Sequence, residues 1–169
     1  MQTALADFIR DTPEGQRAEQ ILRACVHCGF CTATCPTYQL LGDELDGPRG
    51  RIYQIKQVLE GTQPTPVVQQ HLDRCLTCRA CETTCPSGVN YHLLLDIGRE
   101  QVERLQPRPA ALRLLRKAMS WTFATPSRFA PLLCMARLAR PRLPGGLRNK
   151  IAPAPRQVPA VTLPTRRRM

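Results

Sequence analysis

The stretch CVHCGFCTATCP, residues 25–36, decides the fold of this chain. Its four cysteines follow one another at steps of three, three and four residues, and a proline comes directly after the last. The same spacing returns in CLTCRACETTCP, residues 75–86, so the two runs hold eight of the nine cysteines in 169 residues. A repeat of this kind indicates that the eight thiols share one task.

The spacing itself is typical of iron–sulfur ligation, because a C-x2-C-x2-C-x3-C-P run is the bacterial ferredoxin pattern for a [4Fe–4S] cluster. Three closely spaced thiolates reach three corners of one cluster only if the backbone wraps around it, which aims N–H groups at the cluster sulfurs. In two-cluster ferredoxins the fourth cysteine of a run ligates the other cluster. The sequence therefore predicts two [4Fe–4S] clusters, one held by Cys25, Cys28, Cys31 and Cys85 and the other by Cys75, Cys78, Cys81 and Cys35.

Other uses of so many cysteines fit the sequence less well. Zinc sites take four ligands in two C-x2-C pairs, whereas here two complete runs of four each end in Cys-Pro. A secreted disulfide protein would begin with a signal peptide, but MQTALADFIRDTPEGQ has no apolar core and carries acids early. No stretch approaches the roughly 18 to 20 apolar residues of a membrane span. We therefore expect a cytoplasmic protein with reduced thiols.

Charge and proline content divide the chain into two regions. Residues 1–100 contain 9 Lys+Arg against 12 Asp+Glu, and residues 101–169 contain 15 against 1. The first hundred residues hold 6 prolines, and the last 69 hold 10. The sequence predicts a cluster-bearing domain over 1–105, basic amphipathic helices over 106–140 and a Pro/Arg-rich linker over 141–169.

The segments around the cysteine runs have helical patterns. RGRIYQIKQVLEG, residues 49–61, places Ile52, Ile55, Val58 and Leu59 on one face and ends at Gly61. EGQRAEQILRAC and TPVVQQHLDRC predict helices that lead into the first and second runs, and YHLLLDIGREQVERL predicts one after the second. Since no segment alternates with the period of a strand, the predicted fold is all-α, with helices that deliver two cluster loops.

This arrangement resembles the α-helical ferredoxin domain of the succinate dehydrogenase and heterodisulfide reductase group. CVHCGFCTATCPTYQLLGDELDGPRGRIYQIKQVLEG and HLDRCLTCRACETTCPSGVNYHLLLDIGRE are similar to the iron–sulfur subunits of bacterial glycolate oxidase, over most of Ile21 to Glu100. The resemblance implies an electron-transfer subunit that partners FAD-containing subunits oxidising glycolate to glyoxylate. It also implies an acceptor in the quinone pool. A peripheral position on the inner face of the plasma membrane is a separate expectation, which comes from the basic tail.

One departure from that family stands out, because its members continue into two cysteine-rich CCG domains and this chain ends at PTRRRM. We expect a fragment, a truncated product or a split subunit. No residue has the pattern of a nucleotide loop or of a catalytic base, so we expect no catalytic residue in this chain, which would carry electrons while a partner oxidises the substrate.

Three alternatives stay open at this point, and the third of them is a zinc-stabilised interaction protein, which metal analysis would identify. The first keeps the chemistry and changes the substrate: the iron–sulfur subunit of a D-lactate or glycerol-3-phosphate dehydrogenase, or of heterodisulfide reductase. The second is a nucleic-acid-binding protein, suggested by the basic tail and Arg166 to Arg168. Aromatic residues make up only 5% of the chain and it contains no nucleic-acid-binding motif, so we expect no nucleic-acid partner.

Several side chains near the runs have more than one interpretation. We expect His27, His71 and His92 to face solvent, because the ligand positions are already filled. Arg49 and Arg51 either counter cluster charge, face a flavoprotein or form salt bridges at a helix start. Four threonines between the ligands either donate hydrogen bonds to sulfur or pack: Thr32, Thr34, Thr83 and Thr84.

The tail contains two short basic amphipathic helices bounded by prolines, PAALRLLRKAMSWTFATP and SRFAPLLCMARLARP. Leu112, Leu115, Met119 and Phe123 lie near one face of the first. Such helices can lie on an anionic membrane surface, pack on a partner subunit or pack on further domains. Cys134 stands alone and is expected to be a buried structural thiol.

Overall fold

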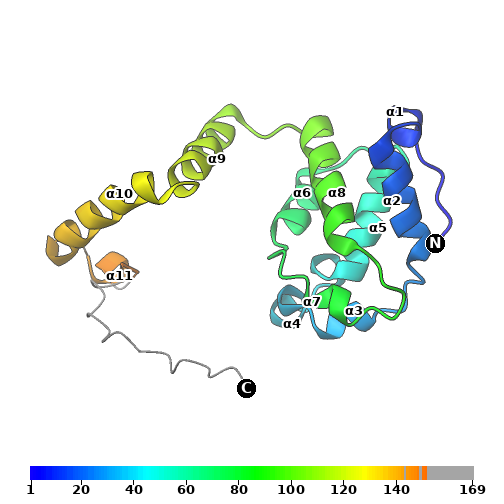
Figure 1. The fold of residues 1–169 in the computed structure, drawn as a ribbon, viewed down its shortest axis with the longest axis horizontal. Helices are drawn as coiled ribbons and strands as arrows, with labels where there is room; N and C mark the ends of the chain where they lie inside the picture. Colours follow the sequence, from blue (N-terminus) through cyan, green and yellow to red (C-terminus); the bar gives the residue numbers. More distant parts are fainter. Residues whose placement is uncertain (143, 149, 152–169) are drawn as a thin grey trace, which may run out of the picture. The chain divides into compact units, whose positions relative to one another are not determined.

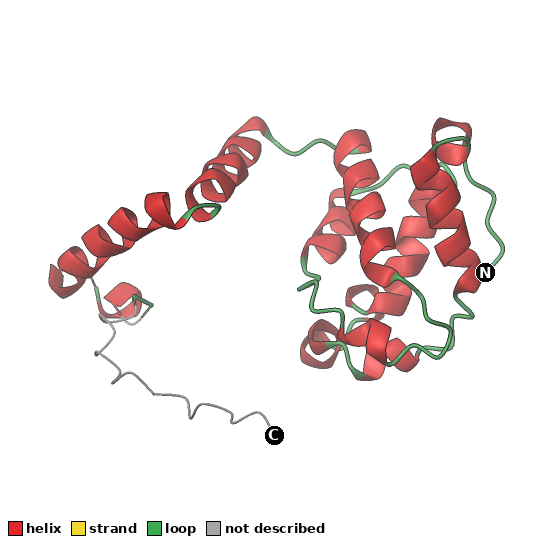
Figure 2. Cartoon of the chain, in the orientation of Figure 1, coloured by secondary structure: helices red, strands yellow, loops and turns green. Residues whose placement is uncertain are grey.

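The computed structural model describes residues 1–142, 144–148 and 150–151. Over these residues the chain is helical and contains no strand, which confirms the predicted all-α fold (Figure 2). The chain divides into two units, Met1–Arg108 and Pro109–Met169. Among the described helices, none is both long and apolar enough to span a bilayer. The domain boundaries expected from composition stay a prediction.

The first unit is a bundle of long helices with short helices at both ends (Figure 1). The long helices are α2 (Pro13–Ala24), α5 (Pro48–Leu59), α6 (Pro66–Asp73) and α8 (Tyr91–Leu105). The short helices are α3 (Phe30–Ala33), α4 (Pro36–Leu41) and α7 (Ala80–Thr83) at one end and α1 (Asp7–Arg10) at the other, together with the 3-10 turn η1 (Glu44–Asp46). The four long helices were all predicted from the hydrophobic pattern; the short ones were not.

Local sequence explains where the long helices begin and end. Prolines open α2, α4, α5 and α6, at a position where a missing N–H costs nothing. The side chains of Thr12 and Thr65 cap α2 and α6 by accepting bonds from the amides of Gly15 and Val68. Gly61 follows α5 with φ of 101°, a left-handed conformation that glycine adopts without strain, and it lies where the sequence predicted the end of the helix.

The core of this unit forms mainly between α5 and α8. The predicted apolar face of α5 is buried, with Ile52, Ile55, Val58 and Leu59 all at most 3% exposed. Gly98 of α8 lets the two helices approach closely, since a Cβ there would lie 2.6 Å from Cγ1 of Ile55. This packing gives the cysteine loops a fixed base.

The two cysteine runs come together at one end of the bundle. α3 and α7 each carry the third cysteine of a run, and α4 begins directly after Cys35. Figure 1 places α3, α4 and α7 side by side at the lower end of the first unit, and α3 contacts both other helices. Fifty residues separate Cys25 from Cys75 in sequence, yet the two runs form one structure.

The second unit contains α9 (Ala110–Phe123), α10 (Pro126–Ala139), the 3-10 turn η2 (Arg140–Arg142) and α11 (Gly145–Arg148). The helices α9 and α10 confirm the two predicted tail helices. They meet where Arg128 lies over the ring of Trp121 at 4.2 Å and Phe123 packs on Phe129 at 5.2 Å between ring centroids.

One expectation for this unit was wrong. Cys134 is exposed on α10, where a buried thiol was predicted. The described part of α10 has no buried residue, because α9 and η2 of its own unit leave its apolar side chains uncovered. Most of the predicted linker, including Arg166 to Arg168, falls outside the described residues.

Candidate metal centre

The two cysteine runs share an unusual backbone conformation. His27 and Gly29 have φ of 60° and 87°, and the matching positions of the second run, Thr77 and Arg79, have 55° and 60°. Three of these four residues are not glycine, and they are the positive-φ non-glycine residues in the part of the chain that the structure describes. Backbone strain of this kind collects at functional sites. The repeated conformation supports the predicted wrapping of both loops.

Five cysteines line one cavity at this end of the bundle, and one of them, Cys81, also lines a second cavity. The other four correspond to one of the predicted ligand sets. They are called here the first thiol group: Cys25, Cys28, Cys31 and Cys85. Three come from the first run, whereas Cys85 is the last cysteine of the second run. Val26, Phe30, Ile52, Val89 and Tyr91 provide apolar walls to the same cavity.

A second cavity is lined by the other four cysteines of the runs. They are called here the second thiol group: Cys35, Cys75, Cys78 and Cys81. Cys81 and Tyr91 line both cavities, so the two groups are neighbours. The structure thus brings together the two sets of four that the sequence assigned to separate clusters. Ligation by these residues stays a prediction.

The eight thiols differ in burial, and burial raises the pKa of a thiol. Cys25, Cys35 and Cys81 are buried, whereas Cys28 and Cys78 are exposed. Burial, together with neighbouring thiols, raises the pKa of Cys81 to about 12 and that of Cys31 to about 11. Without a cation these two thiols keep their protons, so metal binding here releases protons.

The donor set suits the predicted cofactor. Each group offers four sulfurs, the ligand set of a [4Fe–4S] cluster, and each is enclosed by a loop with the wrapped backbone and by apolar side chains. The eight cysteines of the runs would hold two such clusters. When bound, a cluster of this type accepts and releases one electron at a time.

Polar contacts to sulfur are concentrated in the second thiol group. The Thr37 hydroxyl lies 3.1 Å from Sγ of Cys35, and the hydroxyl of Tyr91 donates toward Sγ of Cys75 at 3.7 Å. Burial, and then the nearby Cys75, raise the pKa of Tyr91 well above its ordinary value, so its hydroxyl keeps the proton that it donates.

The sequence pattern gave no sign of Thr37 and Tyr91, since both lie outside the runs. The threonines within the runs instead donate to backbone carbonyls: Thr32 to Gly29, Thr34 to Cys31 and Ala80, and Thr83 and Thr84 to Ala80.

A buried charge network lies beside the second thiol group. The carboxylate of Asp46 is 0% exposed and accepts from Nδ1 of His71 at 3.0 Å and from Arg74 at 2.8 Å. Arg51, with its side chain 1% exposed, lies 3.5 Å from the same carboxylate. Burial alone would raise the pKa of Asp46, but the hydrogen bonds from His71 and Arg74 outweigh it, so the pKa is lowered and the group stays ionised.

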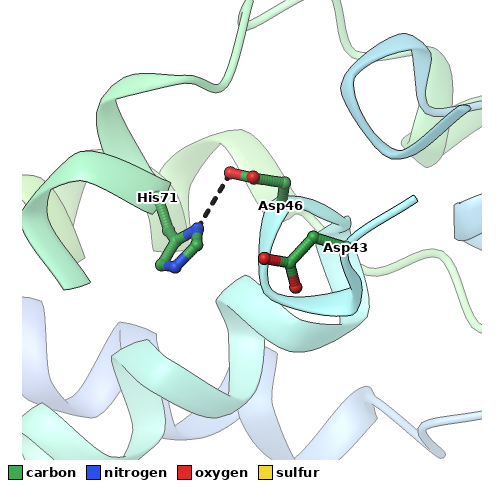
Figure 3. A group of neighbouring side chains, drawn as sticks. All are labelled: Asp43, Asp46 and His71. Atoms are coloured by element: carbon green, nitrogen blue, oxygen red, sulfur yellow. Dashed lines mark hydrogen bonds and ion pairs between the residues drawn. The ribbon is translucent and has the colours of Figure 1, made fainter. Parts of the chain in front are cut away.

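The expected solvent-facing position of His71 was therefore wrong, because its ring is drawn into the core by Asp46. Figure 3 shows the Asp46 carboxylate directed at the His71 ring, with Asp43 beside them. These three side chains could together reach one cation. Two guanidinium groups already lie against Asp46, and Asp43 accepts from the amide of Leu45, so this cluster is an internal salt bridge network.

Two further arginines line the cavities, Arg49 half-buried and Arg79 exposed. Arg49 lines the first and pairs with Glu44 at 2.6 Å, and Arg79 lines the second and pairs with Glu82 at 2.8 Å. The helix-start salt bridge foreseen for Arg49 is therefore present. Glu82 also accepts from the amide of His92 at 2.7 Å, so it caps the start of α8.

The other two histidines are half-buried rather than fully solvent-facing. His27 packs edge-on against Tyr53, with ring centroids 6.2 Å apart. Nδ1 of His92 lies 2.6 Å from the carboxylate of Glu82. The prediction that these two rings face solvent therefore holds only in part.

Comparison with known proteins agrees with this site. Residues 21–89 match the family model described as a 4Fe-4S dicluster domain. That segment contains all eight cysteines of the runs, and the match confirms the predicted cofactor, two [4Fe–4S] clusters. The search of solved structures found no match.

Two curated proteins have sequences similar to this chain. The chain is 60% identical over 151 residues to the glycolate oxidase iron-sulfur subunit of Escherichia coli (strain K12), which covers 89% of this chain and 37% of that protein. It is 43% identical over 95 residues to the probable glycolate oxidase iron-sulfur subunit of Bacillus subtilis (strain 168), covering 55% of this chain and 21% of that protein.

A third relative has a different name. It is a subunit of the dihydromethanophenazine:CoB--CoM heterodisulfide reductase of Methanosarcina mazei, 36% identical over 87 residues, covering 41% of this chain and 21% of that protein. The predicted resemblance to glycolate oxidase iron–sulfur subunits is confirmed by the first two relatives. This chain spans well under half the length of each of these three relatives.

Proposed function

We propose that this chain is an electron carrier of a glycolate-oxidising complex, in which it receives electrons from the FAD of a partner subunit and passes them on toward a quinone. The observation that carries the proposal is the pair of adjacent four-sulfur groups, which share Cys81 and Tyr91 as common lining residues. Two neighbouring one-electron centres suit a flavin, because a reduced flavin holds two electrons and can release them singly.

The chain's own residues have defined tasks in this proposal. Eight cysteines hold the two centres, and the α5–α8 core fixes the loops that carry them. Tyr91 lines both cavities and donates toward Cys75, while apolar walls limit the access of water. Val26, Phe30 and Leu76 are 62–68% exposed within the runs, which offers apolar surface for a partner close to both centres.

The name of the relative from Escherichia coli supports glycolate as the substrate of the complex. The relative from Methanosarcina mazei supports a second candidate, an electron carrier of a heterodisulfide reductase type of complex. The identity of 60% against 36% favours the first.

Co-expression with the FAD-containing subunits of glycolate oxidase tests the proposal. We expect the tagged chain, purified without oxygen, to retain these subunits, and glycolate to bleach its iron–sulfur absorption. D-Lactate and sn-glycerol 3-phosphate serve as substrate controls. A chain with both Cys28→Ala and Cys78→Ala serves as the carrier control. Retention of the subunits with no bleaching by glycolate would contradict the proposed path, and absence of the subunits would contradict the proposed partner.

A further inference from the structure

The two thiol groups differ in the charge that is buried beside them. Each cavity has one arginine that is at least partly exposed, and each of these has its own acidic partner: Arg49 with Glu44, and Arg79 with Glu82. The second cavity is also lined by Arg51, whose side chain is 1% exposed. Arg51 therefore has no counterpart among the described residues that line the first cavity.

Arg51 is held firmly in this position. Its Nε donates to the carbonyl of His71 at 2.8 Å, and its Nη1 donates to the Thr37 hydroxyl at 3.2 Å. That hydroxyl lies 3.1 Å from Sγ of Cys35. A continuous chain of polar contacts thus joins the guanidinium to a sulfur of the second thiol group.

Arg51 shares its buried carboxylate partner with a second cation. Arg51 and Arg74 share one carboxylate, that of Asp46, which also accepts from His71. The carboxylate of Asp43 lies within 4.8 Å of that of Asp46 but is exposed. Arg74 also reaches solvent, with 40% of its side chain exposed, so Arg51 is the buried cation of the network. A buried cation is costly unless an anion lies near it, and four thiolates with their cluster would supply that anion.

The cations near the first thiol group are less deeply buried than Arg51. Arg49 is 36% exposed and its Nε lies 2.6 Å from Glu44. The amino group of Met1 donates to the carbonyls of Leu22 and Cys25 and is partly buried. The hydroxyls of Thr37 and Tyr91, by contrast, contact sulfurs of the second group, at Cys35 and Cys75.

Positive charge and hydrogen bonds at the sulfurs both favour the reduced state of a cluster, which carries one more negative charge. We propose that the buried Arg51 makes the cluster held by the second thiol group the more easily reduced of the two, so that electrons pass from the first group to the second. This inference rests on the proposed function as an electron carrier. In the step, one electron leaves the first centre, which is oxidised, and enters the second, which is reduced.

Arg51 acts here through the network and is a positioning residue. The test is a redox titration of the full chain loaded with iron and sulfide, followed by EPR. Cys28→Ala and Cys78→Ala assign the two reduction waves, because each alters one thiol group. We expect the higher-potential wave to change in Cys78→Ala. Assignment of that wave to the first group would overturn the proposal.

Arg51→Gln should then lower the second wave selectively. At a fixed potential we expect the ratio of reduced to oxidised second cluster to fall by about tenfold, which is about 59 mV for one electron. Arg51→Lys should retain most of the wild-type potential, and Arg49→Gln is the matched control that should move the first wave less. An equal shift of both waves, or no shift, in Arg51→Gln overturns the proposal.

Asp46→Asn separates charge from structure. It disturbs the same network but removes a negative charge, so we expect the second wave to move upward, opposite to Arg51→Gln. A shift of both variants in the same direction would mean a structural role and would overturn the proposal. If Arg51→Gln loses the second cluster, the Asp46→Asn result decides: an upward shift supports the proposal, and an unchanged or lowered potential overturns it.

The proposed function fails by a different result, namely zinc in the purified chain with no acid-labile sulfide. If the chain holds two iron–sulfur clusters and Arg51→Gln changes neither potential, the proposed electron carrier stands and only the proposed direction of transfer is overturned.

Discussion

The first and second thiol groups have nearly the same loop backbone and different surroundings. His27 and Gly29 in one run repeat the positive φ angles of Thr77 and Arg79 in the other. Behind the second loop, however, lies a buried network centred on Asp46, whereas the first loop has a partly exposed pair of Arg49 and Glu44. The spacing of cysteines dictates the loop, and residues far from the runs dictate the environment of each centre.

The largest effect should come from removing one ligand position in each group. Cys28→Ala and Cys78→Ala each replace an exposed thiol in equivalent positions, and each should reduce the iron content from about eight toward about four per chain. Iron and acid-labile sulfide analysis measures this. Cys134→Ala, at the exposed thiol of α10, should leave the content unchanged. Loss of all iron in either single variant would mean that the two groups do not bind independently.

The next effect should distinguish the two arginines by burial. Arg51→Gln removes a buried cation that bonds to His71 and Thr37, and such a loss costs about 3–5 kcal/mol. Arg49→Gln removes one side of a partly exposed pair and should cost at most about 1 kcal/mol.

Thermal unfolding of the loaded chain, followed by far-ultraviolet circular dichroism, measures both variants. A shift of roughly 4–8 °C per kcal/mol is expected for a unit of this size. Equal shifts in the two variants would remove the distinction between the two environments.

A smaller difference in stability is expected between variants of the two glutamates, Glu44 and Glu82, that pair with Arg49 and Arg79. Glu82 is 13% exposed and accepts from Arg79 and from the amide of His92, so Glu82→Ala leaves a helix start without its cap and should cost about 1–3 kcal/mol. Glu44 is 40% exposed, so Glu44→Ala should lower the free energy of unfolding by at most about 1 kcal/mol. Urea unfolding of the two variants checks the order, and a larger cost for Glu44→Ala would contradict it.

The smallest effect concerns the loop backbone itself. Gly29→Ala puts a side chain at φ of 87°, and the strain should cost about 1 kcal/mol in urea unfolding. The new Cβ would meet Nη1 of Arg49, at the flexible end of that side chain, at 2.6 Å. Gly42→Ala, at φ of 67° with open space around it, carries the same kind of strain without the contact to Arg49 and should cost about 1 kcal/mol as well. A gain in stability in Gly29→Ala would show that this backbone conformation is not retained.

Much of this molecule could be predicted from its sequence, because the strongest signals are local. The periodic apolar residues of α5 and the spacing of the cysteines both act over a few residues, and both predictions agree with the structure. The long helices α2, α6 and α8 were found for the same reason. The short helices α3, α4 and α7 have too few residues to show a period.

The environment of the second thiol group could not be predicted in the same way. Thr37, Asp46 and Arg51 meet His71 and Tyr91 only after the chain folds, over separations of up to tens of residues. The expectation for His71 failed because a polar residue next to a cysteine run gives no sign of its distant carboxylate partner. The expectation for Cys134 was wrong in the opposite direction, because this thiol is exposed where burial was predicted. An apolar helix segment is buried only where another element packs on it.

Metal analysis of the full chain purified without oxygen tests the central claim most directly, with EPR recorded before and after reduction by dithionite. The account predicts about eight irons and eight acid-labile sulfides per chain and a spin-coupled signal from two reduced neighbouring clusters. Zinc without labile sulfide would contradict it, and so would iron that remains EPR-silent and unchanged in absorption after dithionite.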